Sequence, residues 1–168
     1  MPKSSLGPEF KAILPTLISI PAFLPARNAQ AQPKWGLGAK LVGRIPLATG
    51  SVEWSNVKLG LGTYFTTQNN VEMTIVTVDG KYKFFDREET LRPYIGLKGA
   101  SIDSSSGMYS AMVTGGGAVG GISWLLTPSI NVEVGAGYLT FTDLSVGSIT
   151  VPIDVGGSIF EVGINWRF

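Results

Sequence analysis

The 168-residue chain contains no cysteine and no histidine. Without cysteine it can form neither a disulfide framework nor a thiolate metal site. Without histidine it lacks the commonest general base and the commonest metal ligand. Nucleophilic catalysis that pairs a serine with a histidine is therefore excluded. We expect a protein that is not an enzyme and that carries no cofactor.

Charge is also scarce, because only 15% of the residues are charged and the net charge is +1. A balance this small predicts no nucleic acid as a partner. Hydrophobic residues make up 44% of the chain, and there are 22 glycines. This composition argues against disorder, and the length suits one domain with a sizeable core.

Residues 1–31 have the features of a cleaved secretory signal peptide. Lys3 and Lys11 precede an apolar run at 12–26, and the following "NAQAQ" offers the small residues that signal peptidase accepts. Prolines interrupt the run, which is also shorter than the roughly 20 residues of a membrane-spanning helix. An ordinary apolar arm is the alternative. Cleavage after Ala31 would leave a single domain at 32–168.

Beyond residue 32 the apolar residues recur with period two rather than 3.6, which predicts strands throughout. Short turns are expected at 66–70, 86–90 and 127–129, and longer loops at "IPLATGS", "DSSSGM" and "TDLSVGSITVPIDVGG". A two-residue hairpin at Asp79–Gly80 completes an even number of strands, and without it there are seven. The eight predicted strands are 35–44, 52–65, 71–78, 81–86, 91–102, 109–126, 130–141 and 157–168.

One face of these strands is bulky and apolar, whereas the other combines charges with glycine. A soluble barrel would place the bulky face inside, but here the face thinned by glycine suits the crowded interior. We therefore predict an all-β fold, a closed antiparallel up-and-down transmembrane β-barrel with lipid outside, closed because unpaired edge amides are costly in hydrocarbon. The predicted interior polar network comprises Lys40, Arg44, Lys58, Lys98, Glu133, Glu161 and Arg167.

The predicted interior leaves two alternatives for transport. The inward charges could line a small selective pore, or they could neutralise one another as a plug. An eight-stranded barrel is just wide enough to be filled by side chains, which favours a non-conducting plug.

Aromatic residues gather at the predicted strand ends beside the short turns and the termini. This placement is typical of the aromatic girdle at one bilayer interface, although aromatics are also common in strands generally. The predicted girdle comprises Trp35, Phe65, Phe84, Tyr94 and Trp124, with Trp166 and Phe168 of the last strand, and a thinner second belt comprises Trp54, Tyr109, Tyr138, Phe141 and Phe160.

The chain ends on "FEVGINWRF", in which every second residue is apolar: Phe160, Val162, Ile164, Trp166 and Phe168. This ending resembles the carboxy-terminal signal by which the assembly machinery reads bacterial outer-membrane barrels. The segments "YFTTQNNVEMTI", "LRPYIGLKGA" and "VGGISWLLTPSINVEVGAGYLTF" resemble hairpins of small OmpX- and OmpW-type barrels. The resemblance covers most of 35–168 and departs from the family at 71–86, where longer strands and a larger loop are usual.

This resemblance implies a bacterial outer-membrane location, with membrane lipid and the barrel-assembly machinery as partners. It also implies short turns on the periplasmic side and longer loops facing outward. It fixes no biochemical role, because one fold serves many functions.

Two other motifs could indicate a functional site, but each also has a purely structural explanation. The glycine-rich "TGGGAVGG" at Thr114–Gly121 could cradle a phosphate, but it lacks the Gly-Lys-Ser/Thr ending and lies within a strand. A structural role is favoured for these glycines, which would allow the barrel wall to curve or the side chains to pack closely. Glu88 and Glu89 could form a metal or catalytic site, but neighbouring carboxylates in a turn are usually solvated, so no metal site is predicted.

The segment Leu144–Gly157 is more apolar than an exposed loop should be. It either extends the last hairpin as a protruding edge that pairs with a partner, or covers the barrel mouth to bind a hydrophobic ligand, or is an ordinary loop. Three functions stay open: a structural or surface-interaction barrel, a narrow conduit for small hydrophobic molecules, and a secreted soluble barrel that binds a lipophile.

Overall fold

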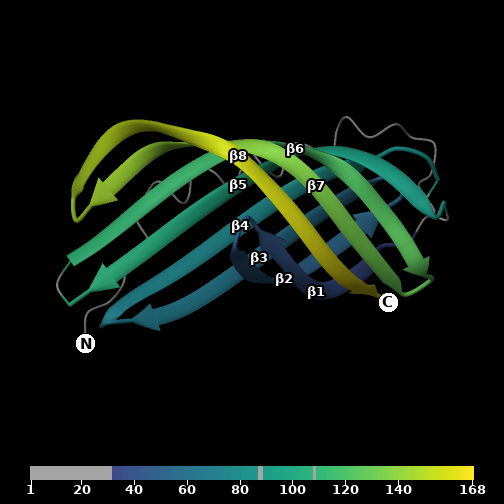
Figure 1. Ribbon diagram of the computed structural model, residues 1–168, viewed down its shortest axis with the longest axis horizontal. Coiled ribbons are helices and arrows are strands. Elements are labelled where there is room, and N and C mark those ends of the chain that lie inside the picture. The colour runs from purple at the N-terminus through teal and green to yellow at the C-terminus, as the bar shows by residue number, and fades with distance from the viewer. Residues whose placement is uncertain (1–31, 87–88, 108) are drawn as a thin grey trace. The chain divides into compact units, whose positions relative to one another are not determined.

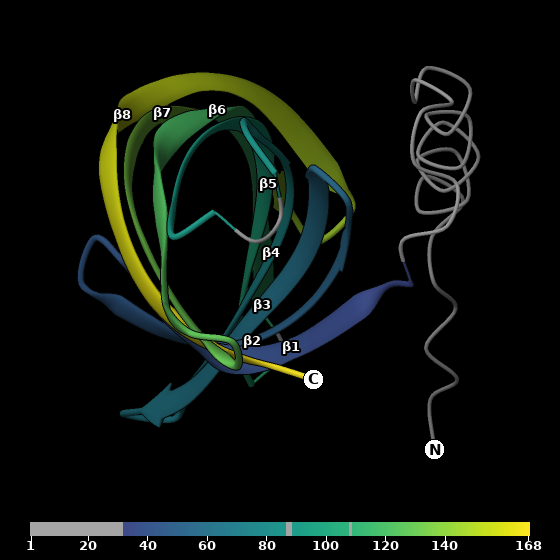
Figure 2. The ribbon, with the colours of Figure 1, turned by 90° about the vertical axis from the view of Figure 1, so that its right-hand side faces the viewer.

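The computed structural model describes residues 32–86, 89–107 and 109–168, so the predicted signal segment 1–31 lies outside the described residues. The described chain forms a closed barrel in which every strand is antiparallel to its neighbours and β1 pairs with β8 (Figure 2). No helix in this part of the chain is long and apolar enough to cross a membrane. The strands are β1 (Lys34–Val42), β2 (Ile45–Trp54), β3 (Val57–Gln68), β4 (Val71–Lys83), β5 (Leu91–Ser106), β6 (Tyr109–Thr127), β7 (Ile130–Val146) and β8 (Ile149–Arg167).

The predicted closed eight-stranded barrel is confirmed. However, one predicted turn is absent and one turn that was not predicted is present, so the number of strands is unchanged. There is no hairpin at Asp79–Gly80, because β4 runs through it and Asp79 pairs with Lys98 of β5. The chain turns instead at Ser55–Asn56, inside the predicted strand 52–65. Ser55 has a φ of 46°, the left-handed conformation of a tight turn.

The sequence carries a signal for both corrections. Polar residues alternate without a break through Thr77, Asp79, Lys81 and Lys83, as in one strand with a wet face. The second signal is in the predicted strand 52–65. Glu53 is at an odd position and Lys58 at an even one, yet both side chains are buried. A single strand would point them to opposite faces, so a turn must lie between them.

The strands meet at two ends of the barrel. We call the end where β1 begins and β8 finishes the terminal end, and it also holds the connections after Trp54, Lys83 and Thr127. The distal end holds those after Val42, Gln68, Ser106 and Val146. The predicted turn 66–70 therefore lies opposite the turns at 86–90 and 127–129. The three segments expected as long loops are largely strand, because "IPLATGS" lies in β2, "DSSSGM" spans the end of β5, and the third spans β7 and β8.

The barrel is much taller on one side. β1 has 9 residues whereas β6 and β8 each have 19. With ordinary rise and tilt these lengths correspond to about 23 Å and about 48 Å of height. Strands β5 to β8 therefore extend beyond the β1–β2 hairpin at the distal end (Figure 1). Most of Leu144–Gly157 is paired strand in this extension, where Leu144 faces Val151.

The barrel is inside-out compared with a soluble protein. Among the described residues, only five hydrophobic side chains are buried, against fourteen polar or charged ones. In β8 the side chains of Val162, Ile164 and Trp166 are more than half exposed, whereas Glu161 is 1% and Arg167 is 7% exposed. The bulky face therefore points outward, and the charged face surrounds the lumen.

Candidate functional site: a charged lumen

In the described part of the chain, charged side chains from every strand but β6 line the lumen. The structure places Lys40, Lys58, Lys98, Glu133, Glu161 and Arg167, all expected there, in buried inward positions. Six further residues that sequence reasoning did not assign to the lumen join them: Glu53, Asp79, Lys81, Lys83, Arg92 and Tyr94.

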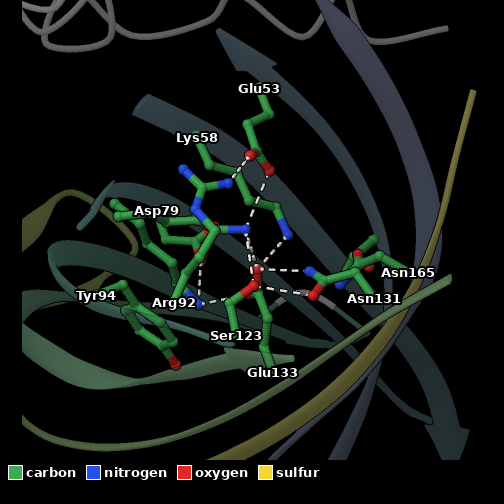
Figure 3. A network of polar contacts seen from close by, with 12 residues as sticks. Glu53, Lys58, Asp79, Arg92, Tyr94, Ser123, Asn131, Glu133 and Asn165 are labelled. Atoms are coloured by element: carbon green, nitrogen blue, oxygen red, sulfur yellow. Dashed lines mark hydrogen bonds and ion pairs between the residues drawn. The ribbon is translucent and has the colours of Figure 1, made fainter. Parts of the chain in front are cut away.

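Glu133 on β7 is the centre of one half of the network (Figure 3). Its Oε1 lies 2.7 Å from Lys58 Nζ and 3.0 Å from Lys83 Nζ, and its Oε2 lies 3.0 Å from Lys81 Nζ. The Nδ2 of Asn131 donates to Oε1 at 3.2 Å. Because Glu133 is only 1% exposed, each of these ion pairs lies away from water.

Glu161 on β8 is the centre of the other half. Its Oε1 accepts from Lys81 Nζ at 2.6 Å and from the Tyr94 hydroxyl at 2.9 Å, and its Oε2 binds Lys98. Lys81 also lies over the Tyr94 ring, with Nζ 4.3 Å from the ring centroid. Asp79 completes this half, because its Oδ2 binds Lys40 Nζ at 2.8 Å. Lys81 thus bridges the two halves.

Toward the terminal end, Glu53 binds Arg92 Nη1 at 2.6 Å and Lys83 Nζ at 3.0 Å. Lys83 also donates to Ser123 Oγ at 3.1 Å, and Ser123 donates to Asn131 Oδ1 at 2.9 Å. These contacts connect Glu53 to the Glu133 half. Because Lys81 joins the Glu133 and Glu161 halves, the buried charged side chains of the described lumen other than Arg167 form one continuous network.

Glycines on the lumen face give these long side chains room. A Cβ on Gly121 would meet the Tyr94 hydroxyl at 2.7 Å, and one on Gly96 would meet Lys81 Cγ at 3.0 Å. The segment Thr114–Gly121 lies within β6, where the hydrogen-bonding edges are occupied by β5 and β7. It therefore packs the barrel wall rather than cradling a phosphate.

Three predicted site residues lie elsewhere. Arg44 is exposed in the β1–β2 turn, because β1 ends at Val42. Tyr94 is 2% exposed and faces the lumen rather than lipid, since it shares its parity with Lys98. Phe65 is 69% exposed but lies toward the distal end of β3, so it does not belong to one girdle with Trp35.

An exposed aromatic girdle does surround the terminal end. Trp54, expected in the second belt, lies there too, next to the β2–β3 turn. The exposed aromatics at this end, among the described residues, are Trp35, Trp54, Tyr82, Phe84, Phe85, Trp124, Trp166 and Phe168. Of the two carboxylates considered for chemistry, Glu88 lies outside the described residues and Glu89 is exposed.

The residues missed by sequence reasoning have a recognisable pattern. Arg92 and Tyr94 alternate with Lys98 on one face of β5, and Lys81 and Lys83 follow Asp79 in β4. Extending the wet face by parity would have found these five, but not Glu53, whose parity is opposite to that of Lys58 because a turn lies between them. Splitting β4 at Asp79–Gly80 obscured that continuity.

The lumen is not electrically balanced, contrary to the expected mutual neutralisation. Its described charged side chains are seven cations (Lys40, Lys58, Lys81, Lys83, Arg92, Lys98, Arg167) and four carboxylates (Glu53, Asp79, Glu133, Glu161), an excess of three positive charges. No group of three or more potential ligands in the described part of the chain could hold a metal ion. Two shallow depressions, of about 280 and 250 Å³, lie on the β3–β4 hairpin near Thr66 and Met73.

Comparison with solved structures shows the same fold. The chain superposes on the neisserial surface protein NspA with a TM-score of 0.51 at 12% identity, covering 81% of this chain and 96% of that one. A major outer membrane protein from Thermus thermophilus gives a TM-score of 0.50 at 11% identity, covering 82% and 100%. No protein-family model and no curated protein sequence matches the chain. At such low identity the likeness shows a shared barrel fold and does not single out the OmpX or OmpW type.

Proposed function

We propose that this chain is a non-enzymatic, integral barrel of the bacterial outer membrane with a side-chain-filled, non-conducting interior. The observation that supports this proposal is that the apolar face of the barrel points outward and the charged face points inward, the reverse of a soluble protein. Large apolar side chains such as Leu97 and Phe160 are 72% and 70% exposed, while the charged residues are buried. A continuous apolar exterior of this kind is unfavourable in water and favourable in hydrocarbon. The shared fold with solved outer-membrane barrels supports the same location.

The interior argues against conduction. Most of the inward cations and carboxylates meet in the two halves around Glu133 and Glu161, with Lys81 between them. An ion that crossed the lumen would have to break these buried pairs, and breaking such a pair costs several kcal/mol, about 3 to 5 for the loss of one partner. These buried pairs support a filled lumen, and we propose a structural or interactive role at the cell surface rather than conduction.

The two other functions fit the lumen less well. A conduit for small hydrophobic molecules needs an apolar path, and a secreted lipophile carrier needs an apolar cavity. The lumen is lined instead by buried charges, so a hydrophobic ligand would leave them without partners.

The distal extension is the proposed surface for interaction. By the outer-membrane resemblance, the terminal end faces the periplasm and the longer strands project outward. The β7–β8 hairpin there exposes Val146, Ile149, Val151 and Val155. We propose this part of Leu144–Gly157 as the contact for a surface partner. The exposed side chains of β8, from Phe160 to Phe168, are the proposed contact for the assembly machinery.

Two measurements test the proposal. Extracted from envelopes, the folded barrel is expected to migrate differently on SDS gels before and after boiling, and a band that does not shift contradicts a membrane barrel. In planar bilayers, the purified protein is expected to give no stable channels. Regular conductance steps would contradict the filled lumen while leaving the membrane location intact.

A further inference from the structure

Arg167 and Asn165 carry buried hydrogen-bond donors that the network does not use. Arg167 is 7% exposed, and its Nε and Nη2 have no hydrogen-bond partner among the described residues. Asn165 is 3% exposed, and its Nδ2 is unpaired in the same sense. Buried donors, and those of a charged group above all, are costly to leave unpaired. The two residues that carry these donors lie two positions apart on the lumen face of β8.

The neighbouring strand places no side chain beside these donors. Arg167 pairs with Gly36 and Asn165 with Gly38 of β1, so no β1 side chain stands between them and β2. On the far side of these glycines are Ser51 and Thr49 of β2, and Thr49 Oγ1 lies 3.4 Å from Asn165 Oδ1. A Cβ on Gly36 would approach Ser51 Oγ to 2.8 Å. The two glycines thus adjoin a guanidinium, an amide and two hydroxyls.

The charge of the surroundings favours an anion there. The lumen holds an excess of three positive charges among its described residues, and Arg167 is the lumen cation without an ion pair among them. The carboxylate of Glu53 interacts electrostatically with Arg167. Both Glu53 oxygens are already bound, by Arg92 and by Lys83. Arg92 Nε is a further buried donor without a partner in the described chain.

We propose that Arg167 and Asn165 form a binding site for a small oxyanion at the terminal end of the lumen. A tetrahedral phosphate group or a carboxylate accepts parallel hydrogen bonds from the guanidinium Nε and Nη2. The Asn165 amide donates a third bond from the adjacent lumen position. The anion offsets part of the positive excess of the lumen. Because the site is formed by lumen side chains alone, it does not depend on the proposed membrane location.

The test uses the full folded barrel in a phosphate-free, non-ionic detergent, titrated with inorganic phosphate. The readout is the Nε–Hε resonance of Arg167 in ¹⁵N–¹H spectra, assigned by its loss in the Arg167→Gln variant. A saturable shift of this resonance is expected. In a second arm, bicelles containing phosphatidylglycerol are compared with detergent without added phosphate, which separates a lipid headgroup from a free ion as the source.

Asn165→Asp gives a test that keeps Arg167 in place. Its carboxylate supplies the missing anion within the chain, so the apparent phosphate affinity is expected to fall at least tenfold while the barrel stays folded. Arg44→Gln, which removes an exposed cation at the distal end, is the matched control and is expected to change the affinity less than twofold. No saturable shift in either arm overturns the proposal, as does a shift that persists unchanged in Asn165→Asp.

Discussion

At the residue scale, Glu133 is the common counter-ion of three buried lysines. Three lysines lie within 3.0 Å of its carboxylate oxygens. We expect Glu133→Gln to lower the free energy of unfolding by about 3 kcal/mol or more, because the lysines stay buried and lose their common counter-ion. Urea unfolding of the reconstituted barrel, followed by tryptophan fluorescence, measures this.

The control for Glu133 is Glu72→Gln, which removes an exposed carboxylate from β4. Its effect on stability should stay within about 0.5 kcal/mol, as for most surface substitutions. Equal effects of the two substitutions would show that net charge, rather than the buried ion pairs, determines stability.

The wrong predictions for Arg44 and Tyr94 have a physical reason, because the sequence indicates the direction of a side chain only through alternation along a strand. Parity along a strand is enough to place Lys40, Glu133 and Glu161 in the lumen, because every second residue shares a face. Arg44 has the same parity as Lys40, yet parity has no meaning once the strand has ended at Val42. The place of Tyr94 at a strand end beside a short turn predicts that it belongs to the girdle, but the acceptor for its hydroxyl, Glu161, comes from a strand distant in sequence. No local pattern encodes that contact.

At the scale of the element, the glycines of β6 permit close strand packing. A Cβ on Gly117 would collide with the backbone carbonyl of Tyr138 on β7. Since backbone cannot move aside as a flexible side chain can, Gly117→Ala should destabilise the barrel by about 3 kcal/mol, at the upper end for overpacking. The fraction of heat-modifiable band after refolding in increasing urea measures this.

Gly99→Ala is the matched control for Gly117. Its added Cβ would lie 3.7 Å from Val78 Cγ2 and 3.9 Å from Gly115 O, which are ordinary contacts. We expect its stability to stay within about 0.5 kcal/mol of the parent, helped by the lower entropy of the unfolded chain. Equal losses in both variants would contradict the packing role of Gly117.

Phe168 at the end of the chain allows two proposed roles to be tested separately: closure of the barrel by its backbone and recognition by the assembly machinery through its side chain. Trp35 and Phe168 exchange backbone hydrogen bonds of 3.0 and 3.1 Å, whereas the Phe168 side chain is 65% exposed. Phe168→Ser therefore keeps the β1–β8 seam. We expect unchanged refolding into detergent but several-fold less assembled barrel in cells, measured as heat-modifiable protein in envelopes. Phe84→Ser, in the same girdle but outside β8, should assemble normally, and equal defects would contradict a terminal signal.

Strand identity was predictable from the sequence to a greater extent than strand limits. Period-two alternation identifies β3 and β6 to β8 directly, because one face of each is apolar over many residues. The turn at Ser55–Asn56 is formed by serine and asparagine, which are turn residues, but it has neither the glycine nor the proline that marks a turn most strongly. Conversely, Asp79–Gly80 has the composition of a hairpin turn, but pairing of β4 with both β3 and β5 keeps it extended. Tertiary pairing overrides local turn preference here.

At the scale of the whole molecule, uneven strand height and the reversed faces together define an orientation. Strands of 9 and 10 residues in the β1–β2 hairpin match the roughly 9 to 11 that a bilayer requires, whereas β5 to β8 exceed it only at the distal end. The aromatic girdle lies at the other, terminal end. In the membrane location that we propose, such a barrel would sit with its terminal end level with one interface and its long hairpins projecting beyond the other.

This orientation can be tested by site-specific labelling, because the chain has no native cysteine and gives no background. Ser148 lies in the exposed β7–β8 turn at the distal end, and Pro128 lies in the exposed β6–β7 turn at the terminal end. With a membrane-impermeant maleimide on intact cells, we expect Ser148→Cys to be labelled and Pro128→Cys to be labelled only after the outer membrane is permeabilised. The reverse pattern would invert the orientation. Labelling of both variants on intact cells would contradict a barrel that spans the membrane, because the two turns lie at opposite ends of the same strands.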